Sequence, residues 1–182
     1  MEPPKNRSIG RSFRINEKLL NVLNSEAERN GLNPNALLNK ILKDYSEYHR
    51  YTKRYGIISL SKMSLSKIIE ACPRECVQET AKEIASIVSI DLFRVMGYSF
   101  SKEDAAFMIN VVLAEHANWF SCEHHASGQK EFYHLQHALG GKWSVYIAEV
   151  VSAIIERCYG KKPKREFLND TAVTLIIPTI NL

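Results

Sequence analysis

Apolar and polar residues alternate from Ile9 to Ile15, before the spacing of the apolar residues becomes helical. One face of this segment is mostly apolar and consists of Ile9, Arg11, Phe13 and Ile15. The opposite face is polar and consists of Gly10, Ser12 and Arg14. The alternation predicts a β-strand whose apolar face is buried, and Arg11 on that face indicates that the strand is ordered only from about Ser12.

Two helices joined by a tight turn are expected after this strand. Asn16 occupies the position of an N-cap, and Gly31 occupies the position where a left-handed residue ends a helix. Asn33 is suited to cap the second helix, because Pro34 fits the first helical position after it. The apolar stripes consist of Leu19, Leu20, Val22, Leu23 and Ala27 in the first helix and Leu37, Leu38, Ile41, Leu42, Tyr45 and Tyr48 in the second.

A strand with no second strand nearby cannot satisfy its own backbone hydrogen-bonding groups, and its edge stays unprotected. A unit of about 40 residues also rarely buries a core of its own. Both problems are solved if two copies associate, so that their strands pair antiparallel and their four helices pack together. The sequence therefore predicts a homodimer at its N-terminus.

The segment RSFRINEKLLNVLNSEAERNGLNPNALLNKIL resembles the ribbon-helix-helix family of DNA-binding proteins, the fold of the Arc and MetJ repressors. The resemblance covers roughly residues 8–50 and rests on the strand, the helix that opens at Asn16 and the GLNPNALL turn. It implies that the paired strands lie in the major groove of DNA as a two-stranded ribbon.

The resemblance also implies which residues contact DNA. Ser12 and Arg14 would face base edges, with Gly10 at the first of three positions that are usually polar in the family. Arg14 can donate two hydrogen bonds to guanine. The turn around Asn33 and Asn35 would point backbone N–H groups at a phosphate. Further phosphate contacts would come from Lys5, Arg7 and Arg11.

The second helix is expected to run on to Gly56, and residues 56–182 are expected to form a second domain after a domain of residues 1–55. The pattern predicts a strand at 56–61 and helices at 64–71, at 74–96, from 101 onward and at 142–160. It also predicts two β-hairpins, which turn at Ser127-Gly128 and at Asn169-Asp170. Ser101 and Asp104 form a variant of the capping box. The fold class is therefore α+β, with a mostly antiparallel sheet in the C-terminal domain.

Five of the six histidines lie between His116 and His137, around the first hairpin. A turn at Ser127-Gly128 would pair residue 125 with 130 and residue 121 with 134. The more apolar face, expected to face the core, would then consist of Phe120, Cys122, His124, Glu131, Tyr133, Leu135 and His137. The other face would present Glu123, His125 and His134, which are candidate ligands for zinc, nickel or iron or simply a polar surface. No other cofactor is expected.

Charge is uneven along the chain. Residues 1–55 contain 11 Lys and Arg against 6 Asp and Glu, whereas residues 56–182 contain 13 against 14. A positive N-terminal third is typical of a module that binds a polyanion. With 45% hydrophobic residues and no apolar run of the roughly 20 residues that span a membrane, the composition predicts a globular protein without membrane contact. The segment MEPPKNRSIGRS lacks the apolar core of a secretory signal, which predicts a cytoplasmic location.

Two functions remain open. The first is a homodimeric transcription regulator that binds double-stranded DNA and whose C-terminal domain senses a small ligand or extends the oligomer. The second is an antitoxin-like protein that neutralises a protein partner and represses its own operon. No nucleophile elbow, phosphate-binding glycine loop or HExxH helix is present, so an enzyme is not expected.

Overall fold

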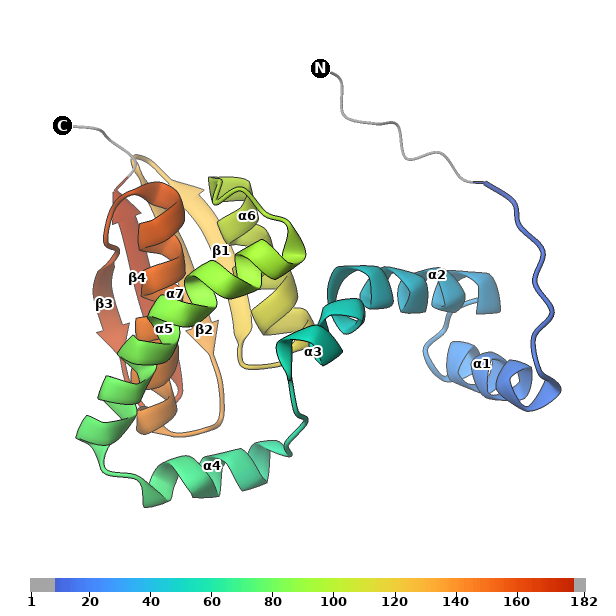
Figure 1. The fold of residues 1–182 in the computed structure, drawn as a ribbon, viewed down its shortest axis with the longest axis horizontal. Helices are drawn as coiled ribbons and strands as arrows, with labels where there is room; N and C mark the ends of the chain where they lie inside the picture. Colours follow the sequence, from blue (N-terminus) through green and yellow to red (C-terminus); the bar gives the residue numbers. More distant parts are fainter. Residues whose placement is uncertain (1–8, 179–182) are drawn as a thin grey trace. The chain divides into compact units, whose positions relative to one another are not determined.

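The computed structural model describes residues 9–178 (Figure 1). The chain divides into two compact units, with the boundary between Ser46 and Glu47. Residues 47–55, expected in the N-terminal domain, belong to the C-terminal unit, because Tyr48 and Tyr51 pack against its core. The combination of helices with one antiparallel sheet confirms the α+β class.

The N-terminal unit contains helices α1 (Glu17–Arg29) and α2 (Pro34–Asp44), at the expected positions. Asn16 caps α1 by accepting a hydrogen bond of 2.9 Å from the Lys18 N–H. The helix ends at Gly31, with φ +64°, where the N–H of Leu32 donates to the carbonyl of Ala27 at 2.9 Å. This is the Schellman arrangement, which needs a left-handed residue and so favours glycine.

The predicted strand is not formed in the single chain. Residues 9–15 have no regular secondary structure, and every one of them is exposed. A strand needs a neighbouring strand for its backbone hydrogen bonds, and within residues 9–178 none lies in the N-terminal unit.

The helical run that begins with α2 continues without interruption to Tyr55. The π-helical segment η1 (Tyr45–His49) and helix α3 (Arg50–Tyr55) follow α2 directly, and Gly56, with φ +70°, ends the run as expected. The strand predicted at 56–61 is wrong, because residues 57–60 are irregular and Ser61 begins a helix instead. Its hydroxyl accepts from the Ser64 N–H at 3.1 Å, which caps α4 (Lys62–Ala71).

The C-terminal unit packs helices against one face of a four-stranded antiparallel sheet with strand order β1-β2-β4-β3 (Figure 1). Its remaining elements are α5 (Arg74–Met96), α6 (Lys102–Phe107), the π-helical η2 (Met108–His116), β1 (Ser121–Ser127), β2 (Lys130–Gln136), α7 (Gly141–Tyr159), β3 (Lys164–Leu168) and β4 (Ala172–Pro178). Ser101 and Asp104 form the expected capping box at the start of α6.

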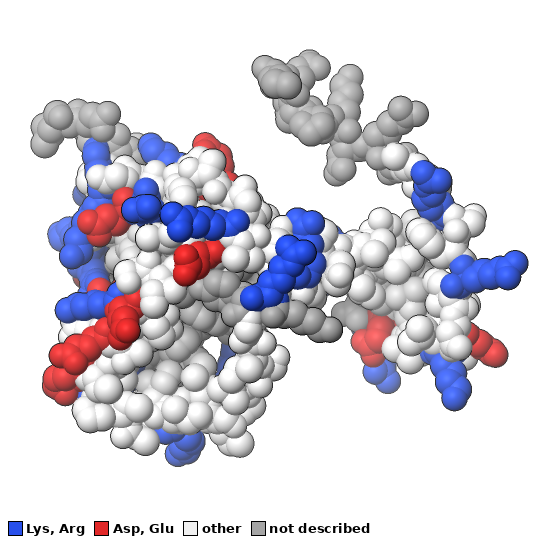
Figure 2. All heavy atoms as spheres, viewed as in Figure 1, with Lys and Arg blue, Asp and Glu red and all other residues white. Residues whose placement is uncertain are grey.

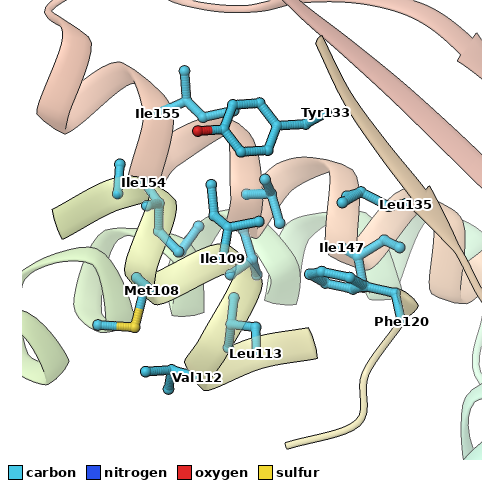
Figure 3. Close-up of a cluster of buried hydrophobic side chains, with 14 of the residues drawn as sticks. Met108, Ile109, Val112, Leu113, Phe120, Tyr133, Leu135, Ile147, Ile154 and Ile155 are labelled. Carbon is cyan, nitrogen blue, oxygen red and sulfur yellow. The ribbon is translucent and has the colours of Figure 1, made fainter. Parts of the chain in front are cut away.

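The core of this unit lies between the sheet and the helices. Figure 3 shows Met108 and Ile109 of η2 close to Ile154 and Ile155 of α7, with Tyr133 of β2 beside them. All five side chains are fully buried. Helix α7 is buried along most of its length, so the packing of the sheet and of the other helices depends on it.

The first hairpin turns at Gly128-Gln129, one residue later than expected, since Ser127 pairs with Lys130. Residue 125 therefore pairs with 132 instead of 130. A shift of two residues keeps each side chain on its expected face, because the side-chain period of a strand is two. Tyr133 and Leu135 are buried, which confirms the core face.

No helix within the described part of the chain is both long and apolar enough to span a membrane.

Candidate DNA interface and polar clusters of the C-terminal unit

The residues assigned to DNA contacts lie at two places in the N-terminal unit. Four of them precede α1 in the exposed extended segment, namely Gly10, Arg11, Ser12 and Arg14. The other two, Asn33 and Asn35, are exposed at the start of α2. Lys5 and Arg7 lie outside the described residues.

Both helix caps in this unit fix the direction of the chain. The backbone of Asn16 is extended, with φ −60° and ψ 137°, so the segment that carries Arg14 enters α1 in a strand-like conformation. The carboxamide oxygen of Asn33 accepts from the Ala36 N–H at 2.8 Å. This bond uses both the Asn33 side chain and the Ala36 N–H, and Pro34 has no N–H, so a phosphate at the start of α2 would be bound by the Asn35 N–H.

Basic side chains are distributed over the N-terminal unit. On the face shown in Figure 2, they project at several separate points around α1 and α2 instead of forming one continuous patch. Such a distribution gives sequence-independent attraction to DNA but does not by itself define a groove contact.

The candidate metal ligands share one face of the β1–β2 hairpin, where Glu123 lies opposite His134. The His125 and His134 rings are stacked, with centroids 5.3 Å apart, and Nδ1 of His134 lies 3.0 Å from Oγ1 of Thr174. Ring nitrogens point outward in the ring plane, so stacked rings do not direct two lone pairs at one ion. Within residues 9–178 no three His, Cys, Asp or Glu side chains are grouped to hold a metal.

The opposite face of the hairpin carries a half-buried polar network. The Tyr159 hydroxyl donates to the Glu131 carboxylate at 2.7 Å, and the Tyr133 hydroxyl lies 3.3 Å from that of Tyr159. His124 stacks on Tyr133 at 4.1 Å and reaches Glu131 at 3.3 Å. Burial raises the pKa of Tyr133 to about 12, so its phenol stays protonated and acts as a structural hydrogen-bonding group.

All four cysteines are free. Burial, with the nearby Glu123 carboxylate, raises the pKa of Cys122 to about 12. Burial also raises the pKa of Cys158 to about 11. Both of these thiols are therefore protonated near neutral pH, and neither is activated as a nucleophile.

His137 forms a closed hydrogen-bond network between β2 and α7. Its Nδ1 accepts from the Leu139 N–H at 3.2 Å, and its Nε2 lies 2.9 Å from Oγ of the fully buried Ser144. The Ser144 hydroxyl donates to the carbonyl of Asn169, so Nε2 is the donor to Ser144 and the ring is neutral. Burial accordingly lowers the pKa of His137.

We expect His137→Leu to lower the free energy of unfolding by about 1–3 kcal/mol, since it leaves the buried Ser144 oxygen without its donor and the Leu139 N–H without its acceptor. The pKa of this histidine is lower in the folded chain than in the unfolded chain, where it is about 6.5. The histidine therefore stabilises the folded chain above pH 6.5, and this stabilisation is lost as the pH falls. The wild-type chain should therefore lose more stability between pH 7.5 and pH 5 than His137→Leu, as measured by urea unfolding. The exposed His125 provides the control, because His125→Leu should keep the wild-type pH dependence.

A cavity in the C-terminal unit was not predicted from the sequence. Trp119, Trp143 and Tyr146 belong to the core or pack against it, and they also line this cavity. Trp119 and Trp143 are far apart along the chain, so the sequence gives no local signal for the cavity.

Comparisons with protein-family models, with characterised proteins and with solved structures gave no match to this chain. The functional argument therefore rests on the chemistry and geometry of the two units.

Proposed function

We propose that the protein is a sequence-specific DNA-binding transcription regulator that acts as a homodimer and contacts the major groove with a two-stranded β-ribbon. One observation carries the proposal. Among the described residues, the N-terminal unit exposes most of its apolar side chains, and its extended segment 9–15 has no strand partner.

The exposed apolar surface is too large for a unit that functions alone. Within residues 9–46 only Ala27 is buried, whereas Phe13 is 71% exposed and Leu19 is 65% exposed. The other exposed apolar side chains of the unit include Ile9, Ile15, Leu20, Val22, Leu32, Ile41 and Leu42. So many exposed apolar side chains on so small a unit indicate an interaction site. A second copy supplies both a strand for residues 9–15 and two helices for the apolar stripes.

Pairing of the two segments would orient the polar face for DNA. With Phe13 and Ile15 packed against the four helices, Ser12 and Arg14 of both copies face outward on the ribbon. The major groove admits a two-stranded ribbon, and an arginine can donate two hydrogen bonds to guanine. The Asn35 N–H at the start of α2 of each copy then meets a phosphate on its side of the groove.

The antitoxin-like alternative is supported less well. Many antitoxins bind their toxins through short segments that are disordered when free. The C-terminal unit instead has a large buried core between its sheet and its helices.

Selection from a random-sequence DNA pool by the full chain tests the proposal, and it does not require a known operator. We expect enrichment of a two-fold symmetric motif, because the dimer presents the same strand twice in one ribbon. Affinity for the selected sequence should fall with salt, with a logarithmic slope of about −0.9 for each phosphate neutralised. A pool that shows no enriched motif, with equal affinity for all sequences, would contradict sequence-specific binding.

Arg14→Ala should reduce the preference for the selected sequence over a scrambled one by about 1–3 kcal/mol, or roughly 5- to 150-fold, for each of the two half-sites. The lost interaction is the pair of hydrogen bonds to guanine, while the phosphate contacts remain. Binding isotherms on both sequences, measured at the same salt concentration, give the preference directly.

The matched control is Arg29→Ala, which removes the same charge from the last turn of α1, where Arg29 pairs with Glu26 at 2.8 Å. It should weaken binding to both sequences equally and leave the preference intact. Equal losses of preference in the two variants would show that Arg14 contributes charge alone.

A further inference from the structure

The cavity of the C-terminal unit has a volume of about 630 Å³. Helices α3 and α4 form one side of the cavity, to which they contribute Thr52 and Ile69. The other side carries His116 and Trp143. Binding sites for small molecules usually have volumes of about 300–1,000 Å³ and are lined mainly by apolar and aromatic side chains. Both features are present here.

One wall of the cavity is an aromatic cluster. The Trp143 and Tyr146 rings are stacked at 4.9 Å, and Trp119 lies edge-on to Trp143 at 5.4 Å. The Trp143 indole N–H donates to the carbonyl of Trp119 at 3.1 Å, so the orientation of the wall is fixed before a ligand enters. Aromatic rings prefer stacked or edge-on neighbours, and this wall therefore favours a flat aromatic ligand.

The charge of the lining is positive. Lys62 lies at the cavity, where it donates to the Asn118 carboxamide oxygen at 3.0 Å. The lining residues that the structure describes include no Asp or Glu. A ligand with an anionic group is therefore favoured over a cation.

A buried polar atom at the cavity has an unused hydrogen-bonding capacity. The His116 side chain is 9% exposed, stacks on Tyr48 at 5.2 Å and lies 3.6 Å from the Glu47 carboxylate. Its Nε2 makes no hydrogen bond within the described residues. Because Nε2 is itself buried and faces the Glu47 carboxylate, His116 shapes the cavity wall, and Lys62 is the charged group that the described lining offers to an anionic ligand.

We propose that this cavity binds a small, flat aromatic compound that carries one carboxylate. The rings lie against Trp119, Trp143 and Tyr146, and the carboxylate lies on the side of Lys62. The compound acts as an effector, because η1 and α3, which line the cavity, directly continue α2 of the N-terminal unit. This regulatory role rests on the proposed function, whereas binding of the compound does not. π-Helical turns such as η1 are rare and frequently occur at functional sites.

The test is calorimetric titration of the full chain, without DNA, with 1-naphthoate and with 1-naphthylmethylamine, which differ chiefly in the charge beside the same rings. We expect saturable one-to-one binding of 1-naphthoate, at least tenfold tighter than binding of the amine. Equal binding of the two probes, tighter binding of the amine, or no saturable binding of either would overturn the proposal.

Two pairs of variants locate the site. Ile69→Trp fills the cavity and should weaken 1-naphthoate binding at least tenfold, while Ile68→Trp, on the exposed side of the same helix, should leave it within twofold. Lys62→Met should weaken the naphthoate severalfold, and the exposed Lys67, which does not line the cavity, provides the control Lys67→Met. Because Lys62 is exposed, this second pair decides the question even if Ile69→Trp does not fold. Equal effects within both pairs would place binding elsewhere.

The effector role has its own readout. Affinity for the selected DNA should change at least fivefold when 1-naphthoate is saturating, and in Lys62→Met the same change should require a severalfold higher concentration of 1-naphthoate. Naphthoate binding without any change in DNA affinity would overturn the effector role. A chain that binds 1-naphthoate but no DNA would contradict the proposed function and leave the site itself intact.

Discussion

Phe13→Ala should weaken dimerisation of the full chain by about 10²- to 10⁴-fold. Phe13 is 71% exposed in the single chain and lies on the apolar face of the extended segment, so pairing of two copies would bury two such rings. Burial of one phenylalanine side chain stabilises by about 1.5–3 kcal/mol, which gives about 3–6 kcal/mol for the pair. Each 1.4 kcal/mol corresponds to about a tenfold change in the dissociation constant.

Sedimentation equilibrium over a range of protein concentrations measures this constant. Met63→Ala is the matched control, because Met63 is 74% exposed but lies on α4 in the C-terminal unit. It should leave the dissociation constant unchanged. A loss of affinity of similar size in both variants, or none in Phe13→Ala, would contradict a dimer interface at the N-terminal segment.

The second large effect concerns the C-terminal unit. Phe93→Ala should lower its free energy of unfolding by about 3–5 kcal/mol, because it leaves a cavity in a closely packed core. Phe93 is fully buried, stacks on Phe100 at 5.1 Å and meets Tyr98 edge-on at 6.1 Å. The truncation therefore removes the contacts of a whole ring with two aromatic neighbours.

Urea unfolding followed by tryptophan fluorescence reports on this unit, since both tryptophans of the chain, Trp119 and Trp143, belong to it. The control is Phe167→Ala on β3, where the side chain is 50% exposed and the loss should stay below about 1.5 kcal/mol. Similar losses in the two variants would show that Phe93 is not a central core residue.

Local signals in the sequence predicted the helices of both units well. Asn16, Asn33 and Ser101 were identifiable as caps because their side chains bond only to nearby backbone groups, and each makes the expected bond. Gly56 and Gly97 end helices at left-handed backbone angles, where glycine has no steric cost. Interactions within one turn of a helix are encoded locally, so a single sequence suffices to predict them.

Strands were harder to predict, since they depend on partners. Residues 57–60 are rich in β-branched residues, but they have no neighbouring strand, and the Ser61 cap directs the chain into α4. In the first hairpin the faces were correct while the register was two residues off, because Gly128 takes the left-handed position that begins the turn. Alternation fixes the face of a residue but not the position of its partner.

The cavity could not be predicted from the sequence for a related reason. Its wall combines Tyr48, Ile69, His116 and Trp143, which are far apart along the chain. Each of these side chains alone has the pattern of an ordinary core or surface residue. Only the packing of α3 and α4 against the rest of the unit brings them together.

Amide hydrogen exchange of residues 9–15 in the full chain tests the central claim most directly, because it reports on the backbone hydrogen bonds that a paired ribbon requires. At protein concentrations well above the dimer dissociation constant, alternate amides of this segment should be protected, and the selected DNA should increase their protection. Dilution below that constant should abolish protection in the free protein. Unprotected exchange of every amide in this segment at every concentration, in a chain that sediments as a monomer of 20.8 kDa, would contradict the ribbon and the DNA-binding mode built on it.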